Sequence, residues 1–511
     1  MTSSDELFLL IKSLGKQEKR YFKLFSSQHT IGDENNYIKL FDAIEAQKNY
    51  DEKAIISKLK DKGFIKHLSS MKVYLYNLIL KSLRNYNSKS TISDEISGAY
   101  KNSEILFNRG FYKQGMKVLL KAKKLAQTEQ RFNFLPDILK LERKFSLALK
   151  KNQSVFFLDE QMEETKRTYS FLEAELKYEY LNLQLWNLFQ RYGYIRNEKD
   201  AEHYRKFLAD PLLTNEKNAT TYQSKFYLYS ILGLTYSALG ELENSRTYYK
   251  KSIDLMRAHP NSIKDNASGY VLACGNLLNS HLRLDDSKAH YEELKKLKGL
   301  NKEYKNSLNI NAQCRSFEIT AIHELLHIYN AGDFHETDKV IPKIHEEIEK
   351  WGERLIQDPV NTIYYYCAYI YLCSGNPKKG LFYLNQILSL PENKIREDLL
   401  GSAKLLSLFI YIEIGDLDLL YYANKSVYRF FNNKDKLLPF EKVILDFFRK
   451  RSSSKSSSNE TVFDLENLRD AMIKVHAKEE GNYMSEYLDI ISWLTAKIEN
   501  RPISEILKRK K

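Results

Sequence analysis

The segment His323-Glu324-Leu325-Leu326-His327 places two imidazoles one helical turn apart, with a carboxylate between them. On a helix, this H-E-x-x-H spacing lets both histidines bind one Zn²⁺ ion while the glutamate acts as a general base. The chemistry would be zinc-assisted hydrolysis. A catalytic zinc of this kind needs a third protein ligand in a defined place, so the residues that follow decide whether the motif is a site.

The residues after the motif do not supply that ligand where it is expected. In the extended form of the motif, Gly and His would stand where this chain has Asn330 and Asp333. Other candidate ligands follow a turn that is expected to send them onto the next helix: His335, Glu336 and His345. We therefore expect the segment to serve helix packing or to be a surface histidine pair, with no metal and no other cofactor. A zinc metallohydrolase that uses His323, Glu324 and His327 stays a remote alternative.

No other catalytic pattern is visible in the sequence. The chain lacks a P-loop, a G-x-G-x-x-G turn, a G-x-S-x-G elbow and the kinase signature set. Since Ser, His and Asp side chains converge in space without a sequence trace, this absence is weaker evidence than a presence. On this basis, the sequence predicts a non-enzymatic protein.

Helical periodicity runs through nearly the whole chain, and no segment alternates apolar and polar residues in the manner of a strand. The 511 residues include only 9 Pro and 19 Gly, which suits long helices joined by short loops. A chain of this length also exceeds the roughly 300 residues at which single cores stop growing. The sequence therefore predicts an all-α protein made of several domains or of a repeat array.

An internal repeat favours the array. Its clearest unit, residues 226–257, carries small and aromatic residues at fixed intervals: Leu232, Gly233, Tyr236, Gly240, Ser245, Tyr249 and Ser252. These intervals resemble those of the tetratricopeptide repeat, in which the small residues let two helices approach closely and the turn glycine joins them. Gly233 and Ser245 are then the expected contact points between the two helices. Serine replaces the usual alanines, and Arg257 stands where a proline is common.

The same turn recurs at Gly110, Gly332, Gly375 and Gly415. The last three are 43 and 40 residues apart, more than the roughly 34 of the standard repeat, which indicates longer helices or loops. The resemblance covers residues 98–436, although two helical stretches inside this range lack the signature. It implies a right-handed superhelical solenoid of antiparallel helix pairs.

Two further segments flank the predicted repeats. Residues 1–90 are expected to form a basic N-terminal helical domain that begins with an amphipathic helix over residues 6–25, with a linker at residues 88–97. Residues 437–511 are expected to form C-terminal helices with a flexible, serine-rich loop at residues 450–460.

The positive charge is confined to one part of the chain. Residues 1–151 hold 29 Lys and Arg residues against 16 Asp and Glu residues, while the remaining residues hold 50 of each. Solvated helix faces explain such an excess, and so does a surface for nucleic acid or for an acidic protein. A nucleic-acid-associated regulator that uses residues 1–151 is therefore the alternative function. Residues 1–90 show no helix-turn-helix pattern.

A helical solenoid presents a concave surface that holds peptides or helices, so the leading hypothesis is a scaffold or adaptor for protein partners. In tetratricopeptide repeats, the residues that face this groove lie at fixed offsets on the first helix of each pair. The resemblance assigns that role to Tyr227, Ser230, Leu234, Tyr365, Tyr369, Leu405 and Phe409. The competing interpretation is that many of these tyrosines are core residues.

The expected location is the cytoplasm. The N-terminus has neither a secretory nor a transit-peptide pattern, and the most apolar run, residues 362–373, is shorter than the roughly 20 residues of a membrane span. We expect that run to be a buried helix. The four cysteines, Cys274, Cys314, Cys367 and Cys373, lack the spacing of a disulfide framework or zinc site and are expected to be reduced core thiols.

Overall fold

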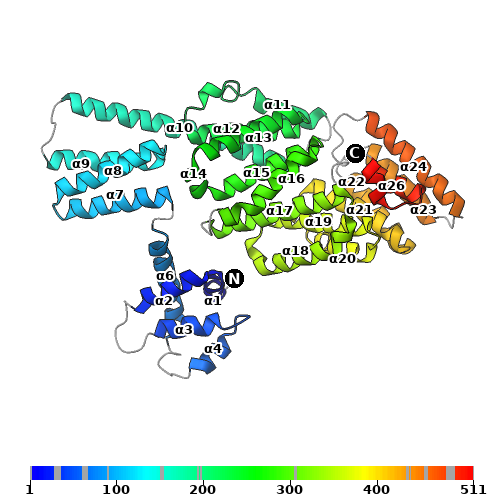
Figure 1. Ribbon diagram of the computed structural model, residues 1–511, viewed down its shortest axis with the longest axis horizontal. Coiled ribbons are helices and arrows are strands. Elements are labelled where there is room, and N and C mark those ends of the chain that lie inside the picture. The colour runs from blue at the N-terminus through cyan, green and yellow to red at the C-terminus, as the bar shows by residue number, and fades with distance from the viewer. Residues whose placement is uncertain are drawn as a thin grey trace. The chain divides into compact units, whose positions relative to one another are not determined.

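The computed structural model describes residues 3–27, 36–59, 67–88, 91–149, 155–192, 195, 198–303, 308–432, 437, 439–453, 458–478 and 489–509. Every regular element in these ranges is an α-helix or a short 3-10 helix, and none is a strand. Figure 1 shows the helices in chain order. The prediction of an all-α protein is confirmed.

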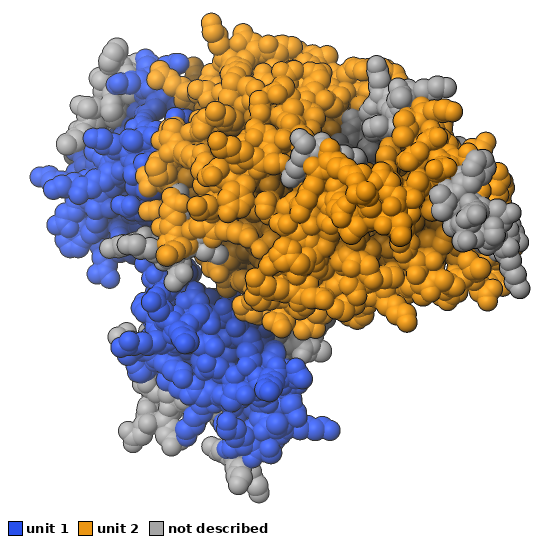
Figure 2. Space-filling view, turned by 45° about the vertical axis from the view of Figure 1, so that its right-hand side comes forward, with its two compact units in different colours: residues 1–165 blue, residues 166–511 orange. Residues whose placement is uncertain are grey.

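The chain divides into two compact units, residues 1–165 and residues 166–511, which Figure 2 distinguishes. The boundary falls inside one long helix, α10 (Val155–Tyr192). Each unit contains its own clusters of buried apolar side chains.

The first helices of residues 1–165 share one apolar cluster: α1 (Ser3–Ser13), α2 (Lys16–Ser27), α3 (Asn36–Glu45), α4 (Glu52–Leu59) and α6 (Leu68–Tyr86). The single helix predicted for residues 6–25 is wrong, because the chain breaks between α1 and α2. There, the backbone N–H of Gly15 donates to a carboxylate oxygen of Glu18 at 2.7 Å, so a side chain satisfies an amide at the start of α2.

A second cluster in this unit belongs to α7 (Ile92–Asn108), α8 (Tyr112–Thr128), η1 (Phe132–Phe134) and α9 (Leu135–Ala148). The helix α7 begins six residues before the predicted repeat start at residue 98, because Thr91 and Asp94 form a reciprocal capping box. The linker predicted at residues 88–97 is therefore mostly helix, and its residues 89–90 lie outside the described ranges.

Residues 166–511 continue α10 and add a series of helical hairpins. The first half contains α11 (Glu198–Leu208), η2 (Glu216–Asn218), α12 (Tyr222–Ala238), α13 (Leu242–Ala258), α14 (Pro260–Asp265), α15 (Ala267–Arg283) and α16 (Ser287–Glu303). The middle contains α17 (Ile310–Ala331), η3 (Phe334–Glu336), α18 (Thr337–Trp351), η4 (Gly352–Arg354), α19 (Gln357–Cys373), α20 (Pro377–Leu388) and η5 (Glu392–Lys394). The last elements are α21 (Glu397–Ile414), α22 (Leu417–Asn432), α23 (Pro439–Ser453), α24 (Ser458–Lys478), α26 (Ile490–Ile498) and α27 (Ile503–Arg509).

The five turns marked in the sequence each join two packed helices. Gly110, Gly240, Gly332, Gly375 and Gly415 all have φ between 70° and 82°, a left-handed conformation that costs glycine little. They connect α7 to α8, α12 to α13, α17 to α18, α19 to α20 and α21 to α22. Successive hairpins in residues 222–432 pack on their neighbours, which is visible in Figure 1. The short helices η4 and η5 account for residues added between the last three turns.

The predicted contact between Gly233 and Ser245 is confirmed. The Ser245 hydroxyl donates to the Gly233 carbonyl oxygen at 2.9 Å, and the Tyr249 ring lies over Gly233. The pair α7 and α8 uses the same contact with the roles exchanged, since Ser103 donates to the Gly115 carbonyl at 2.8 Å. In both hairpins a glycine lets the partner helix approach until a hydroxyl reaches its backbone.

The largest apolar cluster spans α17 to α27. It includes α19, so the prediction of a buried helix at residues 362–373 is confirmed, and no helix of the described residues is long and apolar enough to cross a membrane. The serine-rich segment is shorter than predicted: residues 450–453 end α23, residues 458–460 begin α24, and residues 454–457 lie outside the described ranges.

Candidate interaction surface

The two histidines and the glutamate of the H-E-x-x-H segment on α17 each have a partner on α16. The Nδ1 atom of His323 lies 3.0 Å from Nε2 of His290, and the Glu324 carboxylate pairs with Lys298 at 2.9 Å. The His327 ring lies 5.5 Å from the ring of Tyr291. The residues whose spacing suggested a zinc site therefore lie on one face of α17 and contact the neighbouring helix α16.

Burial controls the electrostatics of the histidine pair. His290 and His323 are 1% and 2% exposed. Desolvation, followed by the charge of His290, lowers the pKa of His323 to about 3, and desolvation, followed by the charges of His327 and His281, lowers the pKa of His290 to about 4. Both rings are neutral at pH 7, and one ring nitrogen donates a hydrogen bond to the other.

The other candidate zinc ligands lie elsewhere. His335 and Glu336 are in η3, and His345 on α18 packs its ring 5.7 Å from the ring of Tyr383. The prediction that the turn carries these residues onto the next helix holds for His345, whereas His335 and Glu336 precede the start of α18. Within the described residues, no group of three His, Cys, Asp or Glu side chains is arranged to hold a metal ion.

The predicted groove residues on α12 are partly buried: Tyr227, Ser230 and Leu234. Ser230 donates to the carbonyl of Phe226 in its own helix at 2.8 Å. Desolvation and the charges of Glu179 and Glu175 raise the pKa of Tyr227. Because both carboxylates belong to α10, this helix faces the Tyr227 side of α12.

The predicted groove residues on α19 and α21 are buried in the chain itself. Tyr365 and Leu405 are fully enclosed, at 0% exposure, and belong to the core. Tyr369 and Phe409 are 3% and 2% exposed, and both contact residues 489–498 near the C-terminus. A groove-facing role therefore does not fit Tyr365 and Leu405, whereas Tyr369 and Phe409 do face another segment.

That segment is α26 with its N-cap residue Asp489. The helix α26 packs on α24 and α27, and Asp489, Trp493 and Lys497 contact first helices of three consecutive pairs. Asp489 caps α26 by accepting from the Ser492 N–H at 3.0 Å. On its outer side, Tyr329 of α17 donates to Asp489 at 3.3 Å, while Tyr369 of α19 donates to Tyr329 at 3.0 Å. The Tyr369 hydroxyl also lies 3.4 Å from the Asp489 carbonyl. The N-terminus of α26 is thus held by two tyrosine hydroxyls.

Further along α26, the contacts move to α21. The Trp493 ring packs edge-on against Phe409, with centroids 5.1 Å apart and planes at 81°. Lys497 pairs with Glu413 at 2.6 Å. The following helix α27 packs on α17, and the Ser504 backbone lies close to Gly332. We call Tyr329, Tyr369, Phe409 and Glu413 the first-helix face.

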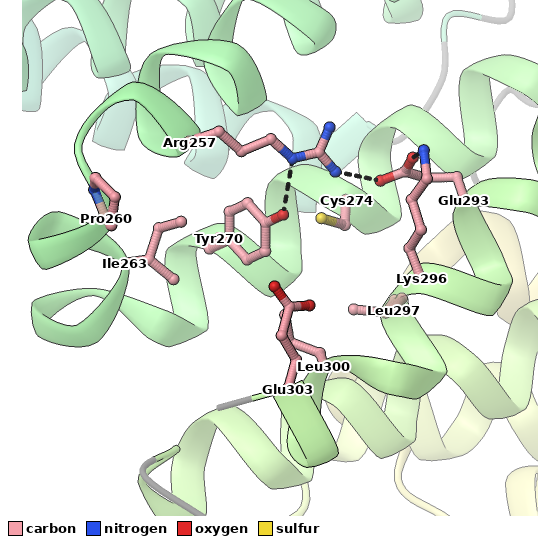
Figure 3. Close-up of a pocket in the computed structure, with 10 residues that line it drawn as sticks. All are labelled: Arg257, Pro260, Ile263, Tyr270, Cys274, Glu293, Lys296, Leu297, Leu300 and Glu303. Atoms are coloured by element: carbon pink, nitrogen blue, oxygen red, sulfur yellow. Dashed lines mark hydrogen bonds and ion pairs between the residues drawn. The ribbon is translucent and has the colours of Figure 1, made fainter. Parts of the chain in front are cut away.

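A polar cavity of about 480 Å³ lies among α13, α14, α15 and α16, and Figure 3 shows its lining. The Arg257 guanidinium donates to the Tyr270 hydroxyl and to the Glu293 carboxylate, each at 3.1 Å. Desolvation raises the pKa of the Cys274 thiol to about 12, so this cysteine stays protonated and is a poor nucleophile. The charges in the cavity are largely paired with one another, which indicates a structural network.

A row of basic side chains follows the exposed face of α8. Lys113, Lys117, Lys121 and Lys124 are exposed, and none has an ion-pair partner among the residues that the structure describes. Lys123, by contrast, pairs with Glu142 and Glu164 at 2.8 and 2.7 Å. The four lysines therefore present unneutralised charge along one side of the helix.

Sequence reasoning placed helices after residue 460 but missed that one of them binds the first-helix face. Asp489, Trp493 and Lys497 recur every four residues and so share one side of α26. That spacing is visible in the sequence, although it does not reveal which surface the helix contacts. Neither a protein-family model nor a curated protein sequence matches the chain.

Proposed function

We propose that this protein is a scaffold or adaptor whose helix pairs form a tetratricopeptide-like solenoid and bind a segment of a partner protein. Five hairpins with left-handed turn glycines, and the serine-to-glycine contact shared by two of them, support the repeat. Stacked helix pairs leave an extended surface formed by their first helices, and binding is the usual function of such surfaces.

One observation carries the proposal: the first helices of three consecutive pairs already hold a helix. Tyr329 on α17 and Tyr369 on α19 contact Asp489, the N-cap of α26, and Phe409 on α21 contacts Trp493 within α26. Solenoids that bind helical peptides use first-helix side chains in this way. Aromatic side chains supply rigid contact area, and Glu413 adds a charge that selects among ligands.

The test is affinity capture of the full chain from a lysate of its native cell, followed by cross-linking and mass spectrometry. It is run with and without nuclease, at low and high salt. We expect discrete proteins whose cross-links map to first helices. Recovery of nucleic acid alone, or cross-links only to second helices such as α20 and α22, would refute the scaffold function.

The lysine row on α8 favours a second candidate, a regulator that contacts nucleic acid through residues 1–151. Four phosphate contacts would give a slope of log affinity against log salt of about −3.6 on duplex DNA. Lys117→Glu with Lys121→Glu should then weaken binding and flatten the slope, while the exposed Lys378→Glu on α20 should change neither. Binding that is independent of salt would exclude this candidate.

A further inference from the structure

We propose that the first-helix face recognises a helix bearing the pattern Asp-x3-Trp-x3-Lys, and that α26 occupies this face in the isolated chain until a partner helix of the same pattern replaces it. The inference rests on the scaffold function and names its ligand. The pattern is that of Asp489, Trp493 and Lys497, which share one side of α26.

Each residue of the pattern meets a chemically matched group. The Asp489 carboxylate accepts from Tyr329, the Trp493 ring meets the edge or face of Phe409, and Lys497 pairs with Glu413. The Lys497 ammonium also lies 5.6 Å from the centre of the Trp493 ring, so the two side chains make a cation–π interaction. The face thus reads a negative, an aromatic and a positive group in that order along one helix.

The geometry of α26 fits that of a ligand. The helix begins with its own cap, Asp489, whose carboxylate accepts from the Ser492 hydroxyl at 2.6 Å, and it packs on α24 and α27. Its polar contacts to the first-helix face come from side chains at its two ends, and its apolar side chains Ile490 and Leu494 are buried. A partner helix with the same residues would make the same contacts.

Tethering explains why the face would be closed in the isolated chain. A segment joined to its own binding surface competes at an effective concentration on the order of millimolar. A partner therefore binds in proportion to the fraction of molecules in which α26 is released. Weakening the α26 contacts should raise the affinity for an added helix by at least about tenfold.

Cys373 provides an internal reporter of this release. It lies on the first helix α19, where desolvation, followed by the charge of Asp489, raises its pKa. Departure of α26 removes the charge of Asp489, which raises the pKa, and the smaller effect of Lys497, which lowers it, so the thiol should react faster with an alkylating reagent. Cys367, buried in the same helix, serves as the matched control because desolvation raises its pKa with no contribution from Asp489.

The experiment measures binding of a labelled peptide of residues 489–509 to the full chain by fluorescence anisotropy. Trp493→Ala removes a large contact, and Lys497→Glu, whose side chain is 42% exposed, is the milder second variant that preserves folding. Both should bind the peptide at least about tenfold more tightly than the original chain and should alkylate faster at Cys373 but not at Cys367. Circular dichroism checks that each variant is folded.

Charge exchange tests the proposed pairing. In the Trp493→Ala chain, Glu413→Lys should abolish binding of the peptide, and a peptide with Lys497→Glu should restore it. Failure of both folded variants to bind the peptide, with Cys373 unreactive, would overturn the inference. A dimer that exchanges residues 489–509 between copies, detected by light scattering, would also overturn it.

Failure of this inference and failure of the scaffold function give different results. If the peptide binds but the capture experiment recovers no protein, the proposed ligand pattern of the first-helix face is supported and the scaffold function is refuted. If partner proteins cross-link to first helices but neither folded variant binds the peptide, the scaffold function is supported and the proposed ligand pattern is refuted.

Discussion

The histidine pair shows how one residue pattern serves different chemistry in different surroundings. His290 and His323 are bonded to each other at 3.0 Å and are nearly inaccessible to water. An imidazole that binds zinc must offer its free nitrogen to the metal. Here the ring that accepts the bond uses its only lone pair, and within the described residues no third ligand is placed for a metal, so the pair stabilises the contact between α16 and α17 in its neutral form.

This arrangement predicts that the protein loses stability in mild acid. Unfolded histidines have a pKa of about 6.5, whereas burial lowers the pKa to about 4 for His290 and about 3 for His323. Below pH 6.5, the unfolded chain binds protons that the folded chain does not, so the free energy of unfolding falls as the pH falls. At pH 5 each histidine removes about 2 kcal/mol. Urea denaturation at pH 7.5 and pH 5 measures the difference.

A substitution isolates the contribution of the pair. His323→Asn keeps a polar side chain but removes the group that takes up a proton. The change in the free energy of unfolding between pH 7.5 and pH 5 should therefore be about 2 kcal/mol smaller in this variant than in the original chain. Equal pH dependence in the original chain and the His323→Asn variant would contradict the account.

At the scale of the helix pair, small residues decide how closely two helices approach. A Cβ atom at Gly233 would lie 2.6 Å from the ring of the buried Tyr249. Gly233→Ala should therefore destabilise residues 166–511 by about 1–3 kcal/mol, since the ring must move in a packed core. Gly299 is exposed on α16 with no atom near its Cβ position, and Gly299→Ala should instead stabilise by up to about 1 kcal/mol. Chemical denaturation of both variants checks the contrast.

At the scale of the whole molecule, the two compact units have separate cores. Phe41 lies in the cluster of α1 to α6, and Leu405 lies in the cluster of α17 to α27, both fully buried. We expect calorimetry to resolve two unfolding transitions. Phe41→Ala should lower the midpoint temperature of one transition and Leu405→Ala that of the other. The cavities created should reduce the free energy of unfolding by about 3–5 kcal/mol for Phe41→Ala and about 2–5 kcal/mol for Leu405→Ala.

A single transition that both substitutions lower would show one cooperative core instead. The Leu405→Ala variant also distinguishes the two interpretations of that residue. As a core residue it should cost stability, whereas as a groove residue it would cost only partner affinity. Thermal melts alongside the capture experiment separate the two effects.

The turn glycines and the serine-to-glycine contact were predictable because they depend on residues close together in the chain. The pair α15 and α16 escaped the pattern because Asp285, at φ 55°, stands where the other turns have glycine. The break between α1 and α2 was missed because residues 6–25 keep an apolar helical period across Gly15. Local periodicity gives no sign of where a backbone interrupts its own hydrogen bonds.

The sequence by itself determined the all-α class and the five glycine turns, since helical period and left-handed backbone are local properties of the chain. Only the tertiary structure decided which surfaces are covered. Tyr369 and Phe409 have the offsets of groove residues, yet α26, more than 80 residues later, contacts both. Contacts over such separations depend on the path of the whole chain, which no local pattern specifies.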